Sequence, residues 1–328
     1  MNTNVAMDID SRIYIAGHKG LVGSAIVQIL LNKGYRNIIT ADRGILDLTV
    51  FYDVESFFKK EKIDFVFLAA AKVGGISANN RYPVDFLKTN LEIQNNVIAA
   101  SAAHKIKRLL FMGSSCIYPK LCPQPIKEEY FLTGSLEPTN RPYALAKISG
   151  IELCRAFNRQ HGTKFMAVMP TNLYGKNDRY HLEDSHVIPA LIHKIHRCKI
   201  NNVPEVHIWG TGKPLREFLF AEDAAEASIQ LMNLPDDQYM NIINYEHGPF
   251  INLGSGREIS ISDLAQLISR VIGYKGNIIQ DVDRFDGTPR KLLDSTRLNS
   301  FFSIQQKPLE EGLAIAYQDY LHSSYTDQ

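Results

Sequence analysis

Residues 12–34 read RIYIAGHKGLVGSAIVQILLNKG, and their pattern indicates the class of fold. It opens with a short apolar run that is typical of a buried parallel strand. The glycines Gly17, Gly20 and Gly23 follow at a spacing of three, and a segment with helical periodicity then runs to Gly34. A strand, a glycine turn and a helix in this order are the context that a dinucleotide-binding fingerprint requires.

The glycine turn has a direct physical use. Glycines let the backbone approach a pyrophosphate closely, and the start of the helix offers N–H groups and the positive end of its dipole. We therefore expect the turn to bind a dinucleotide through Gly17, His18, Lys19, Gly20, Leu21, Val22 and Gly23.

The end of the second predicted strand, residues 37–42, bears on which dinucleotide binds. This strand end normally meets the adenosine ribose. Asp42 there favours a free 2′-hydroxyl and hence NAD, whereas Arg43 and Lys19 favour a 2′-phosphate and hence NADP. Because two cations outnumber the one carboxylate, we predict NADP. In the alternative, both cations are merely solvated.

Strands and helices alternate through the first half of the chain. Apolar strands are expected within 64–75, 108–119 and 164–175, and amphipathic helices over 53–63 and 85–104. This alternation predicts an α/β fold, a Rossmann-type doubly wound parallel sheet. Small residues around Ala70, where the third strand ends, leave room for a ligand against the backbone.

The chain has 328 residues, which exceeds the size at which single cores usually stop growing. We expect a disordered lead-in over 1–11 without a signal core, and an NADP-binding domain over 12–175. Residues 176–328 should form mainly a smaller, mixed α/β substrate-binding domain. Within it, a strand and helix over about 216–232 should pack back on the first domain.

Charge and cysteine content exclude several classes of protein. The 36 basic and 35 acidic residues give a net charge of +1, so no global field favours nucleic acid or an anionic membrane. No apolar run is long enough to span a membrane. The four cysteines, which show neither a CxxC pair nor a zinc spacing, predict reduced thiols in a cytoplasmic protein without a metal: Cys116, Cys122, Cys154 and Cys198.

The stretch YALAK places Tyr143 and Lys147 four residues apart, after Pro142, which suits a helix start. On a helix the two side chains lie one turn apart on the same face. The lysine charge is predicted to lower the pKa of the phenol, which could then exchange a proton with a carbonyl or alcohol oxygen. The alternative is a solvated lysine beside a packed tyrosine.

Three reactive groups follow one predicted strand: Ser114, Ser115 and Cys116. Ligands of open α/β sheets bind outside the carboxyl ends of the strands. A serine there could hydrogen-bond a substrate oxygen beside Tyr143. A thiol at a strand end is often small core filler, but its place two residues after Ser114 favours an active-site role.

The glycine turn, the strand-end serine and the YxxxK spacing together resemble the extended short-chain dehydrogenase/reductase family. Within it, longer strings resemble the GDP-4-keto-6-deoxy-D-mannose 3,5-epimerase/4-reductases, or GDP-L-fucose synthases. The resemblance covers about residues 12–320. Its strings are AGHKGLVGSAI, AAAKVGGI, GSSCIYPK, LEPTNRPYALAKI, MPTNLYG, SHVIPAL, WGTGKPLREFL and DGTPRKLLD.

The resemblance implies one site with two chemistries, epimerisation at C3 and C5 and NADPH-dependent reduction at C4. Cys116 would be the epimerisation base and His186 the acid, Ser114 would bond the C4 oxygen, and Tyr143 would donate a proton with Lys147 as its electrostatic partner. Further cofactor contacts are implied for Arg43, Ala70, Lys147, Pro170, Asn172, Leu173 and His186. GDP-sugar contacts are implied for Lys194, Trp209, Arg216 and Lys291.

Other interpretations of the second half remain open on the residues alone. His186 stands near His181, His193 and His196, but no carboxylate–histidine pattern accompanies them, which argues against a metal. An imidazole there titrates near working pH. Trp209, the only tryptophan, is either a stacking surface for a base or a core residue.

A helix after residue 259 should begin at a capping serine, Ser260 or Ser262. Residues 236–249 match no pattern. The resemblance also implies a homodimer that pairs through the helices at about 90–104 and 143–160.

Three rival functions share these features in part. A 4-reductase would keep Ser114, Tyr143 and Lys147 but would not need Cys116 and His186. A 4,6-dehydratase should carry an acidic residue beside the strand-end serine, where this chain has SSC. A non-catalytic dinucleotide sensor would have no use for the paired tyrosine and lysine.

Overall fold

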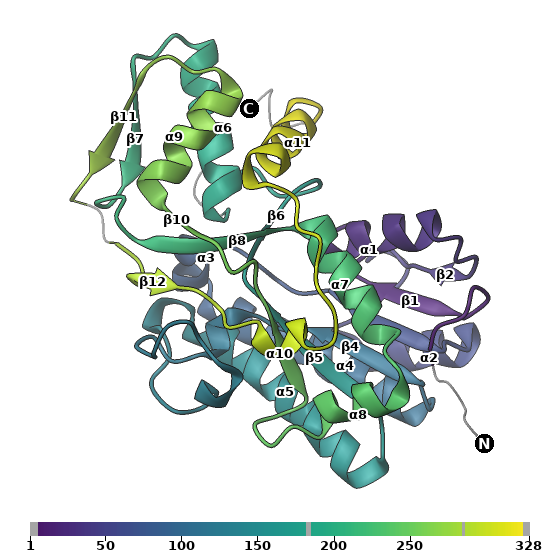
Figure 1. The fold of residues 1–328 in the computed structure, drawn as a ribbon. Coiled ribbons are helices and arrows are strands. Elements are labelled where there is room, and N and C mark those ends of the chain that lie inside the picture. The colour runs from purple at the N-terminus through teal and green to yellow at the C-terminus, as the bar shows by residue number, and fades with distance from the viewer. Residues whose placement is uncertain (1–5, 182–184, 284–285, 324–328) are drawn as a thin grey trace.

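The computed structural model describes residues 6–181, 185–283 and 286–323. Within them, one lobe is built on a six-stranded, all-parallel sheet in the order β2-β1-β3-β4-β5-β9 (Figure 1). The predicted Rossmann-type sheet is confirmed. Its strands are β1 (Ile13–Ala16), β2 (Ile38–Ile39), β3 (Phe65–Leu68), β4 (Arg108–Met112), β5 (Phe165–Pro170) and β9 (Phe250–Leu253).

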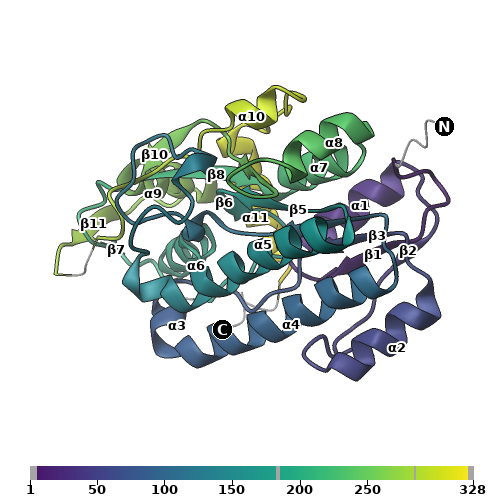
Figure 2. The ribbon, with the colours of Figure 1, turned by 90° about the horizontal axis from the view of Figure 1, so that it is seen from below.

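Helices cover both faces of this sheet, which explains why its strands are apolar without alternation. Ile13 and Ile15 face a core shared with helices on one side, and Tyr14 and Ala16 face the other. The first face carries α1 (Leu21–Asn32), α7 (Ala221–Met232) and α8 (Asp236–Ile243). The second carries α2 (Phe51–Glu61), α4 (Pro83–Ala103) and α5 (Arg141–His161), with α4 and α5 side by side in Figure 2.

Among the described residues, a second lobe combines mixed strands with three helices around its own apolar core. In Figure 1 its β7–β11 pair, α6 and α9 stand apart from the parallel sheet. Its strands are β6 (Asn172–Tyr174), β7 (Glu205–Trp209), β8 (Leu215–Phe220), β10 (Glu258–Ser260), β11 (Asn277–Asp281) and β12 (Arg290–Lys291). Its helices are α6 (Val187–Ile200), α9 (Ile261–Ile272) and α11 (Leu309–Leu321).

Short elements complete the described chain. Ser260 caps α9 by accepting a hydrogen bond from the backbone N–H of Asp263, as one of the two predicted serines should. The short helices are α3 (Ile76–Arg81) and α10 (Thr296–Asn299), with the 3-10 turns η1 (Ser115–Ile117), η2 (Glu128–Tyr130) and η3 (Pro138–Asn140). No described helix is both long and apolar enough to cross a lipid bilayer.

The N-terminal segment differs from the expected disordered lead-in over 1–11. Met7 is buried in the core beside α1 and α7, and its N–H donates to Asn233 Oδ1 at 2.9 Å. A turn then closes from Ser11 N–H to the Asp8 carbonyl. Burial of one apolar side chain therefore fixes residues 6–11, whereas residues 1–5 lie outside the described chain.

After β8 the chain returns to the first lobe for α7, within the segment at about 216–232 that was expected to pack there. It then stays in the first lobe for α8 and β9, which a division at residue 176 with that single return does not include. Residues 236–249, which gave no prediction, contain α8. The buried Arg108 of β4 ties this region to the sheet, because its guanidinium donates to the carbonyls of Met232 and Leu234 and to Asp236.

Candidate functional site

The glycine turn is packed too tightly for any side chain at two of its positions. Gly17 has a φ of +89°, and a Cβ there would lie 2.7 Å from the backbone nitrogen of Ala70. A Cβ on Gly23 would lie 2.2 Å from the Gly17 carbonyl oxygen. The turn therefore brings the ends of β1 and β3 against the start of α1, and it fits the pyrophosphate of a dinucleotide.

Asp42 contacts two side chains of the glycine turn. Its Oδ1 lies 2.7 Å from Lys19 Nζ and 3.2 Å from His18 Nε2. The hydrogen bond from Lys19 holds the pKa of the Asp42 carboxyl below its usual range. Arg43 is 82% exposed, and its Nε is 3.9 Å from Asp47. The positive charge of Lys19 thus offsets the negative charge of Asp42, which would otherwise repel a 2′-phosphate. Arg43 faces solvent.

The remaining predicted cofactor contacts lie at the carboxyl ends of strands. Ala70 follows β3, Pro170 ends β5, and Asn172 and Leu173 lie in β6. The Asn172 amide donates to the Glu217 carbonyl at 2.8 Å, so this side chain also joins β6 to β8. The structure therefore gathers these residues along one edge of the sheet, together with the glycine turn.

Helix α5 places Tyr143 and Lys147 in its first two turns. Lys147 is buried, its Nζ donates to the Met112 carbonyl at 2.7 Å, and burial lowers its pKa to about 7. Burial, and next the nearby Cys116, raise the pKa of Tyr143, whose hydrogen bond with Ser114 opposes the rise. The predicted lowering of the tyrosine pKa by lysine is therefore wrong here, because desolvation outweighs a lysine that is bound elsewhere.

The thiol of Cys116 lies in the turn η1 and is partly exposed. The turn is fixed by Ser114, whose Oγ accepts a hydrogen bond from the Cys116 N–H at 3.2 Å. Asn140 Nδ2 lies 3.3 Å from the sulfur, and Lys291 Nζ lies 3.7 Å from it. Ser114, Cys116 and Tyr143 are thus neighbours, as the sequence predicted, and Asn140 joins them.

His186 precedes α6, immediately after residues 182–184, which lie outside the described chain. Its side chain is open to solvent, yet desolvation, and next the Lys291 charge, lower its pKa below 6.5. Because the side chain is open to solvent, a ligand can reach it. Since Lys291 contacts Cys116 and acts on His186, the structure brings these three residues into one neighbourhood.

The predicted GDP-sugar contacts outside this neighbourhood lie in the second lobe. Lys194 of α6 donates to the His207 carbonyl of β7, and Trp209 ends that strand with 47% of its surface exposed. Trp209 is therefore a surface residue and not part of the core. Arg216 of β8 is partly buried, donates to the Leu215 carbonyl, and has a pKa that burial lowers.

Two residues near the thiol and near Arg216 were not predicted from the sequence. Asn140 contacts the thiol, and its only clue was its place just before the helix of Tyr143. Asp286 binds the Thr211 hydroxyl at 2.7 Å and acts electrostatically on Arg216. Asp286 stands in the quoted string DGTPRKLLD, but nothing in the string shows which residue it meets.

Two of the other histidines and one other cysteine have structural surroundings. His193 and His196 contact the hydroxyls of Tyr320 and Tyr317 in the second-lobe core. Cys154 is buried in α5. The described residues contain no group of three or more histidine, cysteine or acidic side chains arranged for a metal ion.

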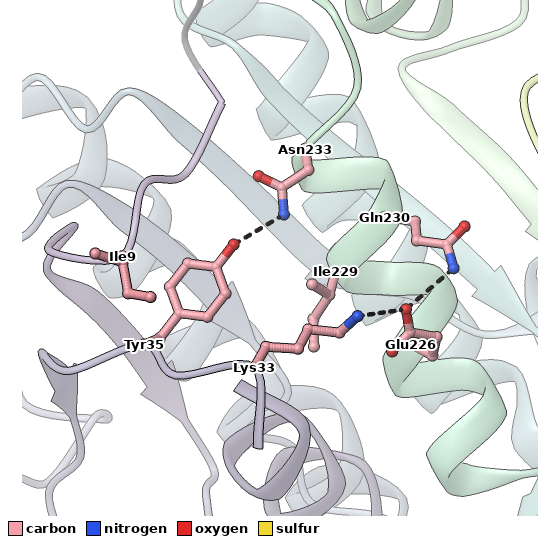
Figure 3. A pocket seen from close by; sticks show the side chains of 7 residues that line it. All are labelled: Ile9, Lys33, Tyr35, Glu226, Ile229, Gln230 and Asn233. Carbon is pink, nitrogen blue, oxygen red and sulfur yellow. Dashed lines mark hydrogen bonds and ion pairs between the residues drawn. The ribbon is translucent and has the colours of Figure 1, made fainter. Parts of the chain in front are cut away.

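A surface cavity of about 280 Å³ lies away from this site (Figure 3). It is formed where α1 ends, whereas the glycine turn stands where α1 begins. Its polar groups pair with one another, Lys33 with Glu226 at 3.0 Å and Tyr35 with Asn233 at 3.2 Å. The lining residues are Ile9, Lys33, Tyr35, Glu226, Ile229, Gln230 and Asn233.

Comparisons with known proteins agree with this geometry. The chain is 51% identical to GDP-L-fucose synthase 1 of Arabidopsis thaliana over 96% of this chain and 94% of that protein. It is 48% identical to GDP-L-fucose synthase of Escherichia coli K12, over 95% and 97% of the two chains.

Among solved structures, a GDP-D-glycero-L-gluco-heptose synthase of Campylobacter jejuni, determined in the presence of NADPH, aligns with a TM-score of 0.89. It is 33% identical, over 96% of this chain and 99% of that chain. A family model described as the NAD dependent epimerase/dehydratase family matches residues 13–244. With a dinucleotide turn, a paired tyrosine and lysine, and these relatives, the chain belongs to the NAD dependent epimerase/dehydratase family.

Proposed function

We propose that the chain is an enzyme that epimerises GDP-4-keto-6-deoxy-D-mannose at C3 and C5 and then reduces C4 to give GDP-L-fucose. The observation that carries this proposal is the thiol of Cys116 beside Ser114 and Tyr143, with His186 linked to it through Lys291. A plain reductase needs the tyrosine but has no use for an additional base and acid. The similarity to the GDP-L-fucose synthases supports the same activity.

Epimerisation uses acid and base groups around one sugar ring. Protons at C3 and C5 are acidic because they flank the C4 ketone, and Cys116 removes them as the base. His186 returns a proton on the opposite face. Ser114 and Tyr143 donate hydrogen bonds to the C4 oxygen, which stabilises the enolate between the two steps.

Reduction uses the same hydroxyl groups. A bound nicotinamide dinucleotide supplies the hydride for C4. Tyr143 gives its proton to the C4 oxygen, and its raised pKa keeps the phenol protonated until that moment. Lys147, which already bonds to the Met112 carbonyl, anchors the cofactor ribose and stabilises the tyrosinate that results.

The GDP end of the substrate binds the second lobe. Trp209 exposes its ring for stacking on the base, and Lys194 and Arg216 supply charge for the pyrophosphate. Lys291 faces the sugar end, beside the thiol. These contacts hold the ketone between Tyr143 and the cofactor.

The cofactor in this proposal is NADP. Lys19 forms an ion pair with Asp42, the group that would favour a free ribose hydroxyl. Arg43 is exposed at the same strand end. The enzyme is cytoplasmic and homodimeric in this proposal, with α4 and α5 at the dimer interface and no metal in the reaction.

The proposal is tested by the number of NADPH molecules oxidised per molecule of keto-sugar, which is followed by the absorbance of NADPH. The proposed enzyme oxidises one NADPH per sugar, a 4,6-dehydratase oxidises none, and a sensor binds NADPH without turnover.

Cys116→Ser should keep NADPH binding and lose most solvent exchange at C3 and C5, because a hydroxyl is a poorer base than a thiolate. Undiminished exchange in this variant would remove Cys116 from the mechanism.

A further inference from the structure

Two nitrogen donors converge on the sulfur of Cys116 from distant parts of the chain. Asn140 Nδ2 is 3.3 Å from Sγ and comes from a residue 24 positions later. Lys291 Nζ is 3.7 Å from Sγ and comes from a residue 175 positions later. The mechanism above gives Asn140 no part and places Lys291 only at the substrate.

The chemistry of these donors distinguishes a thiolate from a thiol. An ammonium group has hydrogens to give and no lone pair to accept one. A thiol sulfur is a weak acceptor, whereas a thiolate is a strong one. A sulfur that faces an ammonium and an amide N–H together is therefore in the surroundings of an anion.

The orientation of the Asn140 amide leaves its oxygen without a hydrogen-bond partner among the described residues, and a bond from its nitrogen to the sulfur can offset this loss. Asn140 Oδ1 is enclosed and has no hydrogen-bond partner within the described chain. An enclosed amide oxygen without a partner is destabilising. A charge-assisted bond from Nδ2 to a thiolate offsets this cost. When Cys116 holds a proton, a half-turn of the amide would instead present Oδ1 to the S–H.

The backbone fixes both donors. Asn140 ends the turn η3 and precedes α5 without bonding that helix through its side chain. Lys291 lies in β12, and the next two residues are bound by Gln124 and by the buried Glu217. The loop after Cys116 pairs with the same segment at Ile126 and Leu293. The distance from lysine to thiol is thus set by secondary structure.

Within the part of the chain that the structure describes, Lys291 is the cation in contact with the thiol. Tyr143 and Lys147 both interact electrostatically with Cys116, but Lys147 Nζ donates to the Met112 carbonyl. His186 and Cys122 interact electrostatically with Lys291. We propose that Asn140 and Lys291 are positioning residues that hold the sulfur of Cys116 and stabilise its thiolate when it acts as the base.

The proposal rests on the proposed function only for what the thiolate does to the sugar, so its test uses the enzyme without sugar. The measurement is the rate at which iodoacetamide alkylates Cys116 between about pH 6 and 9, because alkylation follows the thiolate. Mass spectrometry of the Cys116 peptide separates this thiol from Cys122 and Cys198, which are also partly exposed.

Lys291→Met should lower the alkylation rate about tenfold near neutral pH and move the pH profile to higher pH, because it removes a contacting charge. Asn140→Leu should lower the rate about threefold, the effect of one neutral donor. Lys291→Arg should retain most of the rate. The matched control is Arg290→Gln, the neighbouring cation, which pairs with Glu258 at 2.8 Å.

Unchanged alkylation of Cys116 in Lys291→Met, with a raised KM for the nucleotide sugar, would overturn the proposal and leave Lys291 as a phosphate ligand. NADPH affinity and thermal melting verify that each variant is folded, and Lys291→Gln replaces Lys291→Met if the latter is not. Normal thiolate reactivity together with no product from the sugar would instead contradict the proposed function and leave this inference standing.

Discussion

Tyr143 shows how burial sets the direction of proton transfer. Its pKa is raised by desolvation and by the nearby Cys116, so the ligand-free site holds a neutral phenol across the working range of pH. A neutral phenol is a donor, which suits ketone reduction. Lys147 becomes important later, when negative charge appears on the tyrosine oxygen.

Tyr143→Phe should therefore slow NADPH oxidation by about a hundredfold or more, the usual size of a lost general acid. Solvent exchange at C3 and C5 should continue, because Cys116 and His186 remain. The two rates are measured by NADPH absorbance and by NMR in deuterated water. Normal NADPH oxidation in the variant would show that another group donates the proton.

Lys147 makes stability depend on pH in a direction that can be derived. Its pKa is about 7 in the folded protein and 10.5 as its ordinary value, so unfolding takes up a proton between these pH values. The wild-type protein should lose stability relative to Lys147→Met as pH falls from about 10 to 7, by on the order of a few kcal/mol. Below about pH 7 the difference should level off.

Urea denaturation of both ligand-free proteins across this range measures the effect. A difference in the free energy of unfolding that does not change with pH would contradict a desolvated, neutral lysine in the folded state.

At the scale of elements, Asn252 of β9 joins three segments around the catalytic turn. Its Oδ1 accepts from the Tyr118 hydroxyl at 2.5 Å, and its Nδ2 donates to the carbonyls of Ile126 and Asp294. Its N–H donates to the buried Glu128. Tyr118 directly follows η1, so this buried network holds the turn of Cys116 against the segment that carries Lys291.

Asn252→Leu should cost about 3 kcal/mol of stability, because it leaves one hydroxyl and two carbonyls without partners. Tyr118→Phe, which removes one of these bonds and keeps the ring, should cost about 1 kcal/mol. The free energy of unfolding in urea measures both. Equal stability of Asn252→Leu and the wild-type protein would show that the network does not hold these segments together.

Local pattern explains which elements could be predicted. The strand and helix of residues 12–34 and the helix of Tyr143 follow from periodicity and from glycine and proline positions, which are properties of adjacent residues. The return of α8 and β9 to the first lobe could not be predicted, because apolar strands of both lobes have the same pattern. Likewise, no spacing shows that Lys291 meets a thiol 175 residues earlier.

At the scale of the whole molecule, the outer faces of α4 and α5 are available for a second copy of the chain (Figure 2). Leu145 of α5 is 44% exposed, and Ser149 one turn later is also exposed. An exposed leucine beside a small residue suits an interface between helices. The proposed homodimer would bury this face.

Leu145→Asp should therefore shift the protein from dimer to monomer, because a carboxylate is costly to bury at an interface. Leu31→Asp, at a leucine that is 53% exposed on α1, is the matched control and should leave the dimer intact. Sedimentation measures the mass of both variants. A wild-type protein with the mass of one chain would contradict the homodimer itself.

The central claim is that one site performs both epimerisation and reduction. NMR identification of the product from GDP-4-keto-6-deoxy-D-mannose in deuterated water, with NADPH and NADH compared, tests it most directly. The expected product is GDP-L-fucose with deuterium at C3 and C5, formed faster with NADPH. A C4-reduced sugar that keeps its original configuration and protium at both carbons would contradict it.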